Sequence, residues 1–117
     1  MKPVEFIQCM FEVRDNAHIA HLQTNSYAAH KALDELYTDI VDIADSFIEA
    51  YQGKYGIVTG YSNFKIEEGI NMVDYLKVKA LYAETFKATL KDGDLMQLVD
   101  DLLELFHSTI YKLRFLK

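Results

Sequence analysis

The chain contains no tryptophan, one proline, one cysteine and five glycines among its 117 residues. Because proline and glycine are the residues that most often interrupt a helix, their scarcity favours an all-α fold. The single cysteine, Cys9, excludes an internal disulfide framework. Met10 and Phe11 follow it directly, and this apolar setting predicts a reduced, buried thiol.

Long apolar runs and positive charge are also scarce. Glu5, Glu12, Arg14 and Asp15 interrupt the apolar positions near the N-terminus, which argues against a secretory leader or a membrane span. The 12 lysines and arginines are outnumbered by 18 aspartates and glutamates, giving a net charge of -6. This balance disfavours contacts with a phosphate backbone and suits a protein that concentrates cations. We therefore expect a cytoplasmic protein without membrane or DNA partners.

Apolar residues make up 50% of the chain and recur at helical spacing through most of it. A chain of this length supports a single domain with one core, here residues 1–117. Gly53 is expected to end the second helix, and Asp94 with Gln97 has the capping-box spacing that begins a fourth. Four helices are predicted, joined by one longer connection between the second and third: Pro3 to the break near Asn25, Ser26–Gln52, Ser62 or Asn63 to about Lys91, and Asp94 onward.

Two histidines, His18 and His30, flank the break in the apolar pattern at Asn25 and Ser26. In one continuous helix, the rotation between these positions would leave the histidines about 120° and roughly 18 Å apart. Two antiparallel helices joined at the break would instead bring them level with each other. The sequence therefore predicts a helical hairpin with both imidazoles near its turn.

The second predicted helix carries two pairs of possible metal ligands, each pair one helical turn apart. His30 with Asp34, and Asp45 with Glu49, could each reach one ion from one helix face. The pairs point in nearly the same direction but lie roughly 16 Å apart along the axis, a gap that one chain cannot close. A twofold dimer with this helix antiparallel to its copy would close it. His18, His30 and Asp34 of one chain would then face the Asp45 and Glu49 of the other.

A solvated helix face is the alternative explanation for these carboxylates. The plainly polar face of the same helix is a separate set of residues: Lys31, Glu35, Thr38, Asp39, Asp42 and Ser46. His30, Asp34 and Asp45 instead share their sector with Tyr37 and Val41. This mixture of ligands and apolar residues favours metal binding at a subunit interface over a solvated face, and both interpretations stay open.

In residue type and spacing, the five ligands match the inter-subunit ferroxidase motif of the Dps-like mini-ferritins, a branch of the ferritin superfamily. The end of the chain also resembles this family. Its last helix is similar to the segment formed by Gly93-Asp94, Asp100-Asp101-Leu102-Leu103 and the closing Tyr111-Lys112-Leu113-Arg114-Phe115. The chain therefore resembles a short, divergent Dps-like protein that lacks the lysine-rich tail with which some members bind DNA.

The resemblance implies a single ferritin-like, up-down four-helix domain with one long crossover between helices 2 and 3. It also implies an iron-binding ferroxidase that oxidises Fe(II) with peroxide or oxygen and stores or detoxifies iron under oxidative stress. His18, His30 and Asp34 would bind metal from one chain. The partner's Asp45 would supply an oxygen, and its Glu49 would bind or bridge ions. Assembly would proceed through twofold dimers, which in this family extend to a shell.

The donor set itself limits the metal. Carboxylates mixed with imidazole suit iron, with zinc or manganese as alternatives, rather than a metal that prefers thiolate ligands. Glu104 and His107 form a Glu-x-x-His pair like those of larger di-iron proteins, but no second pair exists and a solvated face explains it better. His21 fits no ligand spacing and is interpreted as a core histidine.

A function from another class remains open at this point. A non-catalytic, ferritin-like helical oligomer could act as an adaptor or bind a small ligand, because a fold does not determine a function. Metal content after purification without chelator discriminates the two hypotheses.

Overall fold

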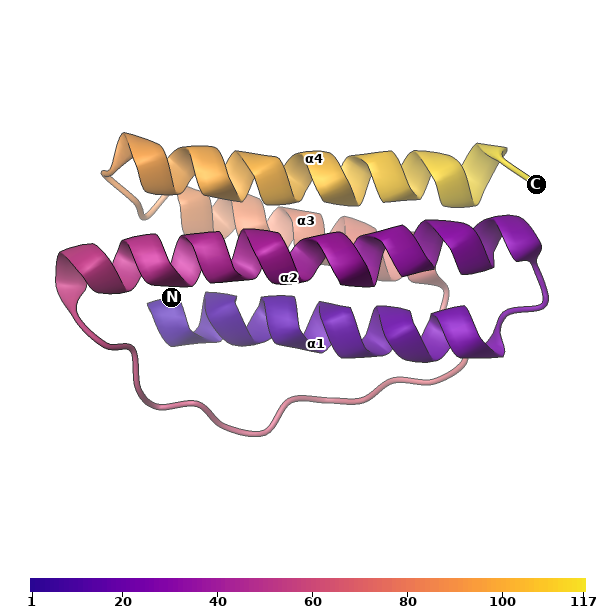
Figure 1. Cartoon of the computed structure of the whole chain (residues 1–117), viewed down its shortest axis with the longest axis horizontal. Coiled ribbons are helices and arrows are strands. Elements are labelled where there is room, and N and C mark those ends of the chain that lie inside the picture. Colours follow the sequence, from indigo (N-terminus) through magenta and orange to yellow (C-terminus); the bar gives the residue numbers. More distant parts are fainter.

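A computed structural model describes all 117 residues and contains four helices and no strand. The helices are α1 (Pro3–Gln23), α2 (Tyr27–Tyr55), α3 (Met72–Lys87) and α4 (Gly93–Phe115). Figure 1 shows α1 and α4 running in one direction and α2 and α3 in the other, with a long connection returning along the bundle. The predicted all-α class and the number of helices are confirmed. No helix has the length and apolar character that a membrane crossing requires.

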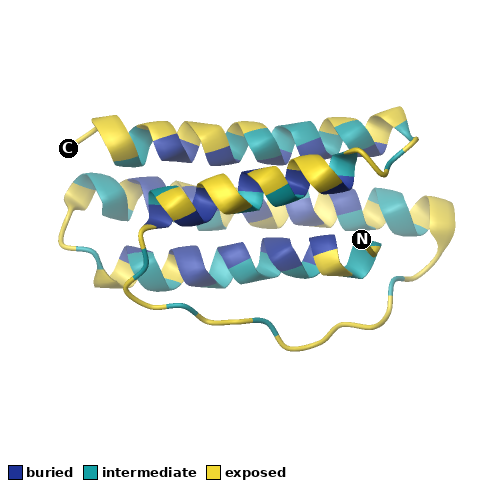
Figure 2. Cartoon of the chain, turned by 180° about the vertical axis from the view of Figure 1, so that it is seen from behind, coloured by how far each residue is buried: buried dark blue, intermediate teal, exposed yellow.

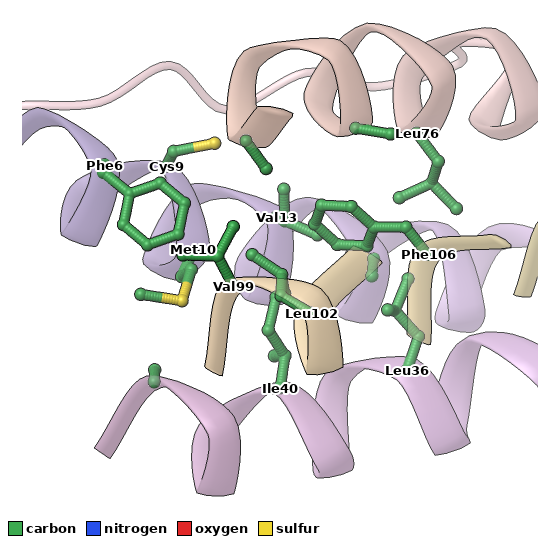
Figure 3. Packing of buried hydrophobic residues seen from close by; sticks show 14 of the residues in the cluster. Phe6, Cys9, Met10, Val13, Leu36, Ile40, Leu76, Val99, Leu102 and Phe106 are labelled. Atoms are coloured by element: carbon green, nitrogen blue, oxygen red, sulfur yellow. The ribbon is translucent and has the colours of Figure 1, made fainter. Parts of the chain in front are cut away.

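Each helix packs on its neighbours in the order α1, α2, α4, α3. The contact between α3 and α1, which closes the bundle, is the smallest. Each helix turns its buried residues toward the centre and its exposed residues outward, as Figure 2 shows. In the core, Val13, Leu36 and Ile40 meet Leu76 and Phe106 from the other two helices (Figure 3). The apolar stripes of all four helices therefore close on one another and leave the outer faces for function.

The turn between α1 and α2 lies where the sequence predicted it. Pro3 occupies the first turn of α1, which tolerates its missing N–H, and α1 ends at Gln23. Ser26 then caps α2, because its hydroxyl accepts a hydrogen bond from the Ala29 N–H at 3.2 Å. The two helices consequently run antiparallel with only a short connection between them.

The second helix ends later than predicted, at Tyr55 rather than Gln52. Gly53 continues the helix, so its expected role as the C-terminal cap is wrong. Gly56 ends it instead with φ 94° and ψ 174°, while its N–H still donates to the Gln52 carbonyl. That backbone conformation is essentially restricted to glycine, and this is why Gly56 ends the helix.

Replacing each of these two glycines by alanine should change stability in opposite directions. Gly53→Ala should stabilise the fold by about 0.5–1 kcal/mol, because the position is helical and no other group lies within 4 Å of an added Cβ. Gly56→Ala should destabilise it by about 1–3 kcal/mol, because alanine rarely adopts a positive φ. Urea unfolding measures both free energies. Shifts of the same sign would contradict this assignment of the helix end.

The third helix begins about ten residues later than predicted, at Met72 rather than Ser62 or Asn63, and ends at Lys87 rather than Lys91. Since α2 and α3 point the same way, the chain must first return along the molecule, whose long axis is 43 Å. The residues between the helices reach about 50 Å at roughly 3.3 Å each. A helix starting at residue 62 would leave only residues 56–61, which reach about 20 Å.

A single buried side chain holds this connection against the bundle. Asn16, on α1, is fully buried, and its Nδ2 donates to the Lys65 carbonyl at 3.0 Å and to the Tyr75 hydroxyl at 3.1 Å. Its Oδ1 accepts the Glu67 N–H at 2.8 Å. One buried asparagine thus has its own polar atoms satisfied by groups of the crossover and of α3, and it joins both to α1.

The predicted capping box at the start of α4 is wrong. The helix begins at Gly93, and Asp94 pairs with Lys54 of α2 rather than capping its own helix. Its hydrogen bond to Lys54 holds the pKa of Asp94 below its usual range. Gln97 donates to Asp101 one turn further on, at 3.1 Å. A tertiary ion pair at the helix end therefore replaces the local cap.

Candidate metal centre

The five predicted ligands all lie on α1 and α2. His18 is exposed on α1, His30 and Asp34 are partly exposed on α2, and Asp45 and Glu49 are exposed further along the same helix. Because α2 is continuous from Asp34 to Asp45, the roughly 16 Å gap between the ligand pairs persists in the folded chain. Within one chain, no three His, Cys, Asp or Glu side chains are placed to hold a metal ion together.

The α1–α2 turn gathers four aromatic rings into one cluster, formed by His18, His21, His30 and Tyr37. The His18 ring stacks on Tyr37 with a centroid distance of 4.1 Å and an interplanar angle of 9°. His21 stacks on His30 at 3.7 Å and 18°, and meets the Tyr37 ring at 5.2 Å and 64°. The hairpin therefore brings His18 and His30 to the same end, as predicted, with His21 between them.

His21 and His30 form two reciprocal hydrogen bonds across the hairpin. The Nδ1 of His21 lies 2.6 Å from the His30 carbonyl oxygen, and the Nδ1 of His30 lies 2.8 Å from the His21 carbonyl oxygen. Since a carbonyl can only accept, both Nδ1 atoms must carry hydrogen. In the neutral rings the lone pair is then on Nε2, which is the nitrogen with which His30 could bind a cation.

The position of these carbonyls explains why the arrangement is stable. The His21 carbonyl belongs to the last turn of α1, where backbone acceptors have no partner within the helix. The His30 ring supplies that missing donor and so caps α1 from the neighbouring helix. His21 itself is buried, as expected of a core histidine, with only 8% of its surface exposed. Its ring supports the proposed ligand His30.

Asp34 is tied to the same cluster through Tyr37, one turn further along α2. The neighbouring Asp34 carboxylate is the main cause that raises the pKa of Tyr37, because it favours the protonated hydroxyl, and burial raises the pKa further. Asp34 therefore neighbours the tyrosine of α2 on which the His18 ring of α1 stacks. Three of the predicted ligands therefore border the hairpin cluster, but they are not close enough to one another to hold one ion together.

The carboxylates of Asp34, Asp45 and Glu49 have no cationic partner within the chain. All seven ion pairs of the molecule involve other acidic residues, among them Glu12 with Lys79 and Glu35 with Lys112. Unneutralised carboxylates on one helix face repel each other, and a bound cation would relieve that repulsion. The donors on this face therefore suit a hard or borderline metal ion.

Two other groups singled out in the sequence lie elsewhere. Glu104 and His107 are both exposed on α4, away from the hairpin cluster, which agrees with a solvated face. Cys9 is a free, buried thiol, as predicted. Burial is the main cause that raises its pKa to about 11, while nearby Lys79 lowers the pKa and Glu12 raises it.

The buried thiol gives a pH dependence with a defined sign. Below pH 9 both the folded and the unfolded chain keep the Cys9 proton, whereas between the ordinary pKa of 9.0 and the folded pKa of about 11 only the unfolded chain loses it. The free energy of unfolding must therefore fall as pH rises through this window. At about pH 10.5 the contribution of Cys9 should be about 2 kcal/mol lower than at neutral pH. Urea unfolding of the unmodified chain and of Cys9→Ala at about pH 7 and 10.5 measures the difference. An equal fall in both proteins would contradict the assignment.

Sequence reasoning did not find His21, Tyr37 or Asn16 as contributors to these arrangements. One signal for the histidine pair was present, because His21 and His30 are equally distant from the centre of the turn at residues 25–26. Residues placed symmetrically about a helical hairpin turn face each other across it. The stacking of Tyr37 on His18 had no comparable signal.

The structure is that of an all-α four-helix protein whose α1–α2 hairpin carries imidazoles and carboxylates. Residues 21–113 match the family of unknown function DUF5856, and the chain belongs to this family. It is also 27% identical over 118 residues to the uncharacterised 14.6 kDa protein in the mobD-ri intergenic region of Enterobacteria phage T4, covering 96% of this chain and 88% of that protein. No solved structure matches the chain. The matched family region contains the four predicted ligands of α2 and begins just after His18.

Proposed function

We propose that this chain is a Dps-like member of the ferritin-like superfamily that binds iron and oxidises Fe(II) at sites shared between two copies. The observation that carries the proposal is the hairpin cluster, in which His21 lies between His18 and His30, while carboxylates without a cationic partner lie further along α2. The long crossover and the directions of the four helices are compatible with such a fold.

Twofold pairing is the step that completes each site. With α2 antiparallel to its copy, His18, His30 and Asp34 of one chain would face the partner's Asp45 and Glu49. The same operation would form a second, identical site at the other end of the seam. Such dimers could assemble further, and the proposed protein is a cytoplasmic homo-oligomer that stores or detoxifies iron.

The chemistry follows from the donor types. Imidazole and carboxylate ligands hold Fe(II), the substrate, and leave coordination positions open to peroxide or oxygen. Two ferrous ions each give one electron to a hydrogen peroxide, which takes up two protons and leaves as two waters. The carboxylates favour the ferric product, because the higher positive charge interacts more strongly with them. Zinc or manganese could occupy the same donors in place of iron.

A second candidate function, small-ligand binding by a non-catalytic oligomer, has one observation in its favour. A cleft of about 330 Å³ lies near the α1–α2 turn, and its apolar wall is made of small and medium-sized side chains. The apolar residues of this cleft are Ala20, Ala29, Leu33, Ile70, Met72 and Leu113. It has the size of a small-molecule site but contains none of the proposed ligands.

An anoxic crystal soak tests the proposal directly. Crystals of the unmodified chain are soaked with Fe(II), and anomalous scattering at the iron edge locates the metal. The expected peak lies beside the Nε2 of His30 and within bonding distance of a carboxylate from the partner's Asp45 or Glu49. A dimer whose copies keep these groups apart, or iron bound only elsewhere, would refute the shared site. Protein purified without chelator and free of metal would favour the second candidate.

A further inference from the structure

Tyr37 is anchored in the protein core and reaches the surface beside the proposed ligands. Its ring is partly buried and packs against the apolar core cluster. On one side it stacks flat against His18 of α1, with 4.1 Å between the centroids and 9° between the planes. His21 meets the same ring edge-on at 5.2 Å. The position of Tyr37 is thus fixed by contacts from both helices of the hairpin.

No ring other than Tyr37 stacks closely on His18. It is exposed on α1 and lies 6.0 Å from His21, in a tilted arrangement rather than a close stack. An exposed histidine on a helix normally samples several rotamers. The parallel contact with Tyr37 selects one of them.

Asp34 lies at the hydroxyl end of the Tyr37 side chain. It precedes Tyr37 by three residues on α2, a spacing that places neighbouring side chains on one face. Of the groups around Tyr37, the Asp34 carboxylate has the largest influence on the tyrosine pKa, which it raises, so the hydroxyl and the carboxylate are neighbours. One tyrosine therefore contacts a proposed ligand on α1 through its ring and a proposed ligand on α2 through its hydroxyl.

We infer that Tyr37 is a positioning residue of the proposed metal site, which holds His18 and Asp34 in their binding arrangement before the metal arrives. This inference rests on the proposed function, since it concerns two of its ligands. A site whose ligands are already ordered loses less conformational freedom when it binds an ion. Groups that orient metal ligands in this way typically change affinity by about 10- to 100-fold when they are removed.

Two substitutions separate the roles of the ring and the hydroxyl. Tyr37→Phe keeps the stack on His18 and removes the hydroxyl next to Asp34, whereas Tyr37→Leu removes both. Co(II) serves as the probe, because it does not react with oxygen under these conditions and its visible spectrum reports coordination geometry. We expect Co(II) affinity to fall about 10- to 100-fold in Tyr37→Leu and by less than about 10-fold in Tyr37→Phe. Tyr111→Leu, an exposed position on α4, is the matched control and should bind as the unmodified chain does.

A readout in the metal-free protein checks the positioning itself. The ring current of Tyr37 should shift the NMR signals of the His18 ring, and the shift should persist in Tyr37→Phe and disappear in Tyr37→Leu. Circular dichroism establishes that each variant folds, and Tyr37→Phe keeps the test decisive if the leucine variant does not.

The outcomes distinguish this inference from the proposed function. If the unmodified chain does not bind Co(II), the proposed function fails, and the inference fails with it. If the unmodified chain binds tightly and the folded Tyr37 variants bind equally well with an unchanged spectrum, only the positioning role of Tyr37 is overturned. Equal losses in Tyr37→Phe and Tyr37→Leu would assign the whole effect to the Asp34 contact and overturn the part played by the His18 stack.

Discussion

Two double variants, His30→Ala/Asp34→Ala and Asp45→Ala/Glu49→Ala, should each lose tight Fe(II) binding and oxidise Fe(II) no faster than background. An equimolar mixture of the two, however, should recover about one quarter of the unmodified activity. This recovery follows from a site divided between two copies of the chain. A site within one chain would give none, because each variant would carry a broken site wherever it was placed.

The expected fraction comes from counting sites in a twofold dimer. Random re-pairing of equal amounts makes about half of all dimers mixed, and each mixed dimer contains one complete site and one that lacks every altered ligand. One of two sites in half of the dimers is about a quarter of the total. Dimers must exchange subunits for this result, so the mixture is first dissociated in mild urea and then returned to buffer.

Folding should survive these substitutions. The four positions are partly or fully exposed on α2, and alanine is the best helix former, so circular dichroism should show unchanged helix content. Stability without metal could even rise, because fewer unpaired carboxylates repel one another on this face. Glu104→Ala/His107→Ala, which removes an exposed carboxylate and imidazole from α4, is the matched control and should oxidise Fe(II) normally. A mixture that stays at background while both variants fold and exchange would refute the shared site.

The sequence predicted those parts of the fold that depend on local pattern. Helix spacing of apolar residues and the break at Asn25 and Ser26 were sufficient for four helices and for the hairpin that brings His18 and His30 to the same end of the bundle. The start of α3 was not predictable in this way. It depends on the distance that the chain must cover outside the bundle, which is known only once α2 and α3 are seen to run parallel. Asn16 fastens that crossover through contacts with residues about fifty positions away.

In the candidate site, too, local pattern predicted some features, while others depend on residues far apart in the sequence. Ligand spacing along α2 is a property of one helix, so His30 with Asp34 and Asp45 with Glu49 could be paired from the sequence. The fixed tautomer of His30 depends on a carbonyl of α1, and this required the structure.

The largest effect on stability is expected from Phe86, the residue that ties the shortest helix to the rest of the core. Its ring stacks on Phe6 of α1 with a centroid distance of 4.2 Å and an angle of 8°, and it meets Phe47 of α2 edge-on at 5.9 Å. Only 1% of its surface is exposed. Since α3 otherwise contacts α1 only lightly, these rings provide much of the connection between α3 and the α1–α2 hairpin.

Phe86→Ala should therefore lower the free energy of unfolding by about 3–5 kcal/mol, the usual cost of a cavity left by a buried aromatic ring. For a domain of this size the melting temperature should fall by about 12–20 °C. Phe115→Ala, at the exposed end of α4, is the matched control and should change stability by less than about 0.5 kcal/mol. Thermal unfolding followed by circular dichroism measures both. A fall of less than about 5 °C for Phe86→Ala would mean that α3 is held mainly by α4, because the loss of the stack with Phe6 would then have cost little.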